Sequence, residues 1–100
     1  MARFDVYKYS AAVPFVVDVQ ADLLSDLKTR VVIPLLPHTQ AKKEVLPRLK
    51  PVIKIHGKNY VLMTTDIGTL KISDLGTPSE NIQEQRQTIT EAIDFLMAGF

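Results

Sequence analysis

The chain has 100 residues, of which 46% are hydrophobic and 23% are charged. This size and composition predict a single globular domain over residues 1–100, built around one core, and they exclude a disordered chain. Twelve basic and eleven acidic residues leave a formal charge of +1, which is too small for a protein that binds nucleic acid mainly through its phosphates.

The sequence contains no cysteine, so neither disulfides nor thiolate metal sites are available. The N-terminal residues alternate between polar and apolar, where a secretory signal needs a continuous apolar stretch of roughly 7 to 15 residues. The longest apolar run, VVIPLL at residues 31–36, is far shorter than the about 20 residues that cross a bilayer. We therefore expect a soluble, cytoplasmic protein with no membrane partner.

The first half of the chain predicts strands. Residues 3–9 alternate with strand period, and PFVVDVQ resumes a strand after a short connector at residues 10–14, which gives an N-terminal hairpin. The segment ADLLSDLKTR, residues 21–30, has several turn formers and predicts a loop or a single helical turn. A strand restarts at residues 31–33, and Pro34 predicts an edge or a bulge there, because proline cannot donate to a β ladder.

The second half begins with the least sheet-like stretch, residues 37–51, where AKKEVL predicts a turn or two of helix. A second hairpin follows, with strands VIKI and YVLMTT joined by HGKN, in which Gly57 and Asn59 suit unusual backbone angles. Residues 69–73 predict a short strand.

The last predicted element is an amphipathic helix over residues 81–97. Two starts resemble a capping box, Thr77 with Glu80 and Asn81 with Glu84, and we favour the later one. Its stripe at spacings of three and four is apolar apart from Arg86 and predicts a buried face. The stripe consists of Ile82, Arg86, Ile89, Ile93, Leu96 and Met97. Strands followed by one terminal helix favour an α+β fold or a β-barrel with an added helix.

Few residues suggest catalysis or a metal. His38 and His56 lie in predicted turns without a carboxylate cluster, so we expect surface histidines and no metal. Asp18 and Asp22 are either paired carboxylates or, as we favour, turn-bonding residues. The segment TTD at residues 64–66 is typical of a strand end and an Asx-type turn rather than of a nucleophile. The four glycines are isolated and form no phosphate loop, so no nucleotide cofactor is expected.

Two further segments are candidates for binding. The basic group in the middle of the chain, formed by Lys42, Lys43, Arg48 and Lys50, lacks interleaved aromatic residues, so it favours a solvated loop that attracts an acidic partner over a nucleic-acid site. At the C-terminal end, Met97 to Phe100 form either a frayed helix end with Phe100 folded onto its own core or a presented contact surface.

Several landmarks of the sequence together resemble the CcdB toxin family, whose members are plasmid-addiction proteins that poison DNA gyrase. The DVQ-x-D and MTTD strings are the most specific of them. In chain order, the landmarks lie at residues 4–9, 15–20, 30–35, 51–55, 63–66 and 89–100.

This resemblance implies a fold that is mainly β with a C-terminal helix, a small antiparallel β-barrel or sheet like that of messenger-RNA interferase toxins, in a two-fold homodimer. It implies a binding activity without catalysis or cofactor, in which the dimer enters the cavity of the gyrase A-subunit dimer and holds gyrase in its DNA-cleaved state. The matching gyrase-facing positions are Leu23, Leu24, Asp94, Met97, Ala98, Gly99 and Phe100.

The resemblance also implies a second partner, a CcdA-like antitoxin whose disordered segment contacts Tyr9, Lys42, Lys43 and Arg48. Operator DNA is bound only by the toxin–antitoxin complex. One position departs from the family, because many members have a tryptophan where this chain has Ala98, and that tryptophan stacks on a gyrase arginine. This departure leaves open a retired or retargeted toxin that is kept as an antitoxin-binding module. A ribonuclease toxin on the same fold is a second, separate alternative.

Overall fold

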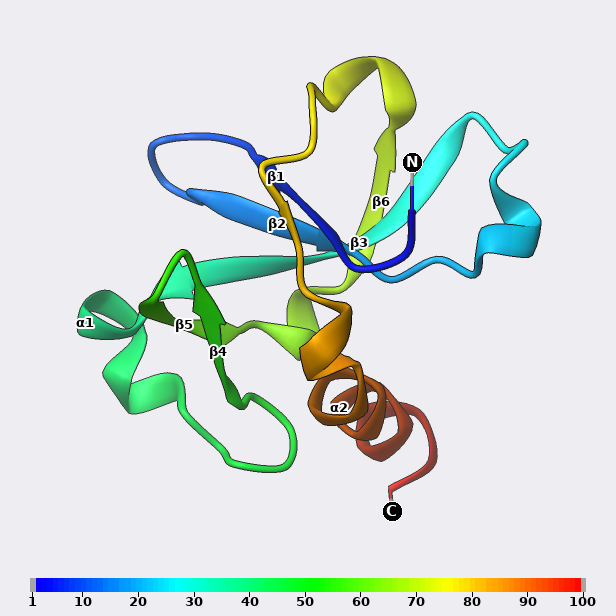
Figure 1. Ribbon diagram of the computed structural model, residues 1–100. Helices are drawn as coiled ribbons and strands as arrows, with labels where there is room; N and C mark the ends of the chain where they lie inside the picture. The colour runs from blue at the N-terminus through cyan, green and yellow to red at the C-terminus, as the bar shows by residue number, and fades with distance from the viewer. Residues whose placement is uncertain (1, 100) are drawn as a thin grey trace.

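The strands of the molecule form one antiparallel sheet in the computed structural model, which describes residues 2–99. The sheet has the order β4-β5-β3-β2-β1-β7, and β6 pairs with β3 off this path. It curls into a half-barrel, and helix α2 lies beneath its concave side (Figure 1). The strands are β1 (Asp5–Lys8), β2 (Phe15–Asp18), β3 (Thr29–Pro37), β4 (Val52–Ile55), β5 (Lys58–Leu62), β6 (Gly68–Lys71) and β7 (Glu80–Asn81). The predicted fold, mainly β with a C-terminal helix, is confirmed.

Strand β3 occupies the centre of the sheet, so the prediction that Pro34 marks an edge or a bulge is wrong. One side of β3 pairs with β2, with Val16 opposite Pro34. The other side pairs with β6 up to Val32 and with β5 from Leu35 onwards. The Pro34 carbonyl accepts a bond from the Met63 N–H on this second side, at 2.9 Å. The missing N–H of Pro34 therefore faces the gap between β6 and β5, where the ladder needs no donor.

Side chains, rather than a β ladder, join the two ends of the curled sheet. At the outer edge of β4, the Gln85 amide accepts a bond from the Lys54 N–H at 2.9 Å and donates one to the Lys54 carbonyl at 2.8 Å. Glu80 in β7 accepts a bond from the His56 N–H at 2.9 Å. These bonds occupy backbone groups of an edge strand that would otherwise be open to pairing with another chain.

The β4–β5 hairpin turns at His56 and Gly57, whose φ angles are 50° and 77°. Two successive residues with positive φ are typical of a type I′ hairpin turn. The predicted hairpin is confirmed, and so is the role of Gly57. The prediction for Asn59 is wrong, because the second left-handed position is His56.

Helix α2 spans Arg86–Ala98, later than the predicted start at Asn81. Asn81 belongs to β7, a strand that the sequence pattern did not reveal, and a 3₁₀ turn, η5 (Gln83–Gln85), precedes the helix. Asn81 bonds the Gln83 N–H, but Glu84 does not complete the predicted capping box. The predicted stripe is correct at Ile82 and Ile89, which are fully buried, and Ile93 packs against the same core, whereas Arg86 and Met97 are exposed.

Short helical turns occupy the connections. The predicted turn in residues 21–30 is confirmed as η1 (Asp22–Leu24), and that in residues 37–51 as α1 (His38–Ala41) followed by η2 (Lys42–Glu44). The remaining turns are η3 (Thr64–Asp66) and η4 (Ile72–Asp74). The predicted strand through residue 65 therefore ends at Leu62, and η3 is the strand-end turn expected for TTD.

Strand β2 is buried on both faces, which explains its run of apolar residues. Phe15 and Val17 belong to the main core between the sheet and α2, together with Ile33, Ile53 and Ile89. Val16 faces the other side and packs with Tyr7 and Val32, beneath the partly buried Val13, Leu70 and Leu75.

Tyr7 on this second face gives the protein a predicted sensitivity to alkaline pH. Burial, with the nearby Asp5 and Asp18 carboxylates, raises the pKa of Tyr7 to about 12. An unfolded tyrosine has a pKa near 10, so this group favours folding below pH 10, and that contribution is lost as the pH rises toward 12. Denaturant titrations should show a loss of about 2 to 3 kcal/mol over this window.

The matched variant is Tyr7→Phe, which removes the titrating group. Between pH 10 and pH 12, this variant should therefore lose about 2 to 3 kcal/mol less unfolding free energy than the wild type. At pH 7 the substitution should cost no more than about 1.5 kcal/mol, the upper end of the net contribution of a single hydrogen bond. An unchanged alkaline transition in Tyr7→Phe would contradict this prediction.

Candidate binding surfaces

The last turn of α2 exposes the helical residues that the sequence assigned to a target. Met97 is 76% exposed, and Asp94 and Ala98 are also exposed. The helix is fixed to the core through Ile89 and Ala92, which are fully buried. The well-packed helix therefore holds the Met97 side chain in an ordered, solvent-exposed position, where a partner can reach it.

Gly99 ends the helix in the left-handed conformation, with φ of 80°, and its N–H bonds the Phe95 carbonyl at 2.9 Å. A Cβ added at Gly99 would meet no atom of the described chain within 4 Å. The glycine is therefore required by its backbone angle rather than by crowding within the chain. The prediction for Phe100 lies outside the described residues.

The η1 turn carries the other two predicted target residues. Leu23 is 95% exposed and Leu24 is 50% exposed. Leu27, in the same loop, is 51% exposed, and we did not single it out from the sequence although it lies in the same leucine-rich run. In Figure 1 this turn and the C-terminal end of α2 lie at separate places on the molecule.

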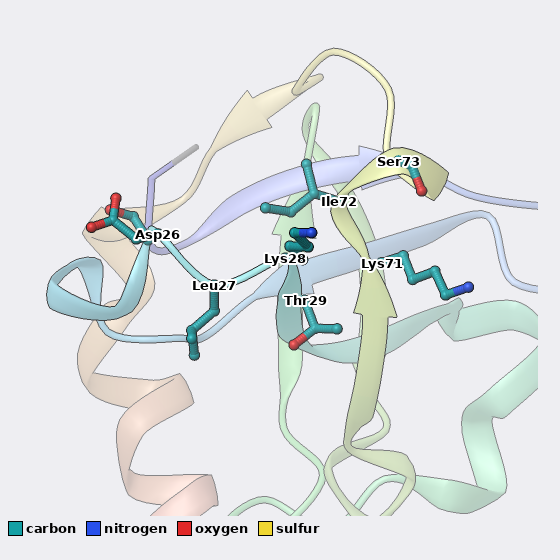
Figure 2. Close-up of a pocket in the computed structure, with 8 residues that line it drawn as sticks. Asp26, Leu27, Lys28, Thr29, Lys71, Ile72 and Ser73 are labelled. Carbon is teal, nitrogen blue, oxygen red and sulfur yellow. The ribbon is translucent and has the colours of Figure 1, made fainter.

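A hollow of about 550 Å³ adjoins the η1 loop, between residues 25–29 and the end of β6 with η4. Leu27 lines the hollow from the first of these segments and Ile72 lines it from the second, and the Lys71 side chain extends away to one side (Figure 2). The hollow enlarges the apolar surface around the exposed leucines.

A buried polar network lies behind the η1 loop. Arg30 and Asp18 form an ion pair, Nε to Oδ2 at 2.7 Å, with both side chains fully buried. The other oxygen of Asp18 accepts a bond from the Gln20 N–H at 3.0 Å. Asp18 therefore forms an ion pair and a turn hydrogen bond and is not half of a carboxylate pair. Asp22 accepts a bond from the Arg3 N–H at 2.8 Å, so it too is a hydrogen-bonding residue of the loop.

The basic residues in the middle of the chain form two separate groups. Lys42 and Lys43 are exposed on η2. Arg48 is also exposed, but its guanidinium carbon lies 4.3 Å from the centre of the Phe95 ring, in a cation–π contact with α2. Arg48 and Asp94 line one depression of about 310 Å³, so a predicted antitoxin residue and a predicted target residue are neighbours.

Tyr9, the remaining predicted antitoxin residue, is 47% exposed and lies on a different surface. It lines a cavity of about 220 Å³ together with Val13, Pro34 and Asp66. Any partner that contacts both Tyr9 and Lys42 therefore has to extend across several elements, as a flexible segment does.

The two histidines occupy ordinary positions. His38 begins α1, and the exposed His56 contacts Ser79 Oγ at 2.8 Å and Glu80 Oε2 at 3.2 Å. Within residues 2–99, the structure contains no group of three or more histidine, aspartate or glutamate side chains that could hold a metal ion. None of the helices in the same range is long and apolar enough to span a membrane.

The fold and these surfaces define a small antiparallel half-barrel that carries exposed apolar side chains on a loop and on a terminal helix. The family model described as CcdB protein matches residues 3–99 of the chain. The chain therefore belongs to the CcdB family. It is a toxin of a toxin–antitoxin module, in which an antitoxin is its partner.

Proposed function

We propose that this chain acts as a homodimer that binds the A subunit of DNA gyrase, traps the cleaved DNA complex and is neutralised by a CcdA-like antitoxin. The observation that carries the proposal is the exposure of Leu23 and Met97, at 95% and 76%, on two ordered elements of a CcdB-family chain. The proposal includes a cytoplasmic location, where gyrase acts, and operator DNA binding only with the antitoxin. It assigns no catalytic residue and treats residues 1–100 as one domain.

The test is a cleavage assay with purified protein, DNA gyrase, ATP and supercoiled plasmid. Linear DNA should accumulate as the protein is added, and the antitoxin segment should suppress it. Intact RNA incubated under the same conditions should stay uncleaved. RNA cleavage would favour the ribonuclease alternative, whereas antitoxin binding without plasmid cleavage would favour a retired or retargeted toxin.

The homodimer is a separate prediction. We expect sedimentation equilibrium at micromolar concentration to give twice the mass of the chain, because the family resemblance implies a two-fold dimer and an isologous interface is the commonest form of oligomer. The measurement should be repeated at several concentrations to obtain the dissociation constant. A monomer mass throughout the micromolar range would contradict the prediction.

For the antitoxin surface, replacing Lys42 and Lys43 together by glutamate should weaken binding of the acidic antitoxin segment about tenfold at low salt. Both side chains are exposed, so the charge reversal should change association much more than stability. Replacing Lys54 and Lys58, which are also exposed but lie on the β4–β5 hairpin, gives a control with the same change in net charge. Equal effects of the two double variants would mean that only net charge matters.

A further inference from the structure

The η1 turn is held at both ends although its middle residue is almost fully exposed. At its start, Asp22 Oδ1 accepts a bond from the Arg3 N–H at 2.8 Å. At its end, the Leu24 carbonyl accepts a bond from Gln20 Nε2 at 2.9 Å. Leu23, which is 95% exposed, lies between these two attachments.

Gln20 is itself fixed to the rigid part of the sheet. Its side chain is buried, and its Oε1 accepts a bond from the Val31 N–H of β3 at 3.1 Å. Its backbone N–H donates to Asp18, which is locked by the buried ion pair with Arg30. A continuous series of hydrogen bonds therefore links the centre of the sheet to the turn.

This arrangement has a consequence for binding. An apolar side chain on an unrestrained loop samples many positions, and fixing it on binding costs conformational entropy. Restraints that already hold the loop in place in the free protein reduce this cost. A residue that restrains η1 therefore lowers this cost through the turn, whether or not it also touches the partner.

We infer that Asp22 and Gln20 are positioning residues, which hold the η1 turn so that Leu23 is presented to the toxin's target in one conformation. This inference rests on the proposed function, in which the target is gyrase.

The first experiment compares three variants for binding to the purified gyrase A subunit. Asp22→Ala removes the acceptor of the Arg3 N–H and should weaken binding about three- to tenfold, the range expected when one hydrogen bond is lost. Asp22→Asn also removes the charge but keeps the acceptor oxygen, so it should bind within about twofold of the wild type. Leu23→Ala, which deletes the presented side chain, should weaken binding at least as much as Asp22→Ala.

Affinity for the antitoxin segment and the melting temperature separate positioning from a general structural role. Asp22 is exposed, so Asp22→Ala should leave the antitoxin affinity close to the wild-type value and lower the melting temperature by no more than the few degrees that one hydrogen bond contributes. A gyrase effect that is matched by an equal antitoxin effect, or that is shared by Asp22→Asn, would overturn the inference.

The second experiment needs no partner. The Leu24 and Leu27 amides bond the Ala21 and Leu24 carbonyls within the loop, at 2.9 and 3.1 Å. Their hydrogen exchange should become at least threefold faster in Asp22→Ala and remain slow in Asp22→Asn. Gln20→Met, which has a similar volume but no amide, should accelerate the same two amides if the variant stays folded at the assay temperature.

These results distinguish failure of the inference from failure of the proposed function. If Leu23→Ala binds gyrase normally while the exchange results hold, the turn is positioned as inferred but its target is not gyrase. If Leu23→Ala weakens binding while Asp22→Ala changes neither affinity nor exchange, the positioning role is refuted and the gyrase surface stands.

Discussion

Replacing Arg30 by methionine is expected to lower the free energy of unfolding by about 3 to 5 kcal/mol. The substitution keeps most of the side-chain volume but leaves the Asp18 carboxylate fully buried without its cation. A buried charge that loses its partner is among the most destabilising changes that a single substitution can make. Urea denaturation of the variant beside the wild type measures the loss.

The matched control removes both charges together. In the double variant Asp18→Leu with Arg30→Met, no unpaired charge remains, so most of the lost stability should return. The Arg30 Nη1 atom has no hydrogen-bond partner among the described residues, which makes the wild-type pair an imperfectly satisfied one and strengthens this expectation. A double variant as unstable as Arg30→Met alone would show that the hydrogen bond from the Gln20 N–H to Asp18, and not the charge pair, stabilises this region.

Deleting Gly99 and Phe100 is expected to abolish gyrase trapping in the plasmid-cleavage assay while changing stability by less than about 1 kcal/mol. Gly99 is exposed and makes one backbone hydrogen bond, to Phe95, and the anchoring residues of α2 remain in place. The loss of trapping is expected because both positions match gyrase-facing residues of the CcdB family. Antitoxin binding should persist, since neither deleted residue is among the predicted antitoxin contacts, although one of these, Arg48, packs on Phe95 in the same helix.

Thermal melting decides between this prediction and a structural role for the chain end. A loss of about 3 to 5 kcal/mol, the usual cost of truncating a buried phenylalanine, would place Phe100 in the core. Undiminished plasmid cleavage by the truncated protein would place the gyrase contact elsewhere.

The complementary variant is Ala98→Trp. Ala98 is exposed, so the larger side chain should be tolerated, and trapping should become at least tenfold stronger if the stacking geometry of the family is retained.

Local patterns in the sequence were sufficient for most of the secondary structure. The apolar run of β2 and the glycine of the HGKN turn each act through neighbouring residues, so their structural roles could be predicted without the fold. The family resemblance likewise depends on short strings such as MTTD. Leu23 and Leu24 were singled out through this resemblance and not through a local pattern.

The tertiary structure decided the features that depend on register. In the β2–β3 pairing, Asp18 lies opposite Val32. Arg30 precedes Val32 by two residues, so it lies on the same face of β3 and can reach Asp18. The buried ion pair therefore becomes visible only when this register is known. Pro34 is tolerated because its missing donor faces a gap between two other strands. Asn81 was assigned to the helix because its local sequence suits a cap, yet pairing with Asp5 makes it part of β7.

The sequence by itself therefore determined the family and the main strands, and it supplied the residues that are proposed to bind the partners. The tertiary structure alone decided how those residues are held: Gln20 and Asp22 restrain the η1 turn, and Arg48 packs on Phe95 beside Asp94. The physical reason is that periodicity and turn chemistry act over a few neighbouring residues. Contacts between residues 19 or 47 positions apart exist only once the strands have paired and the helix has packed against the sheet.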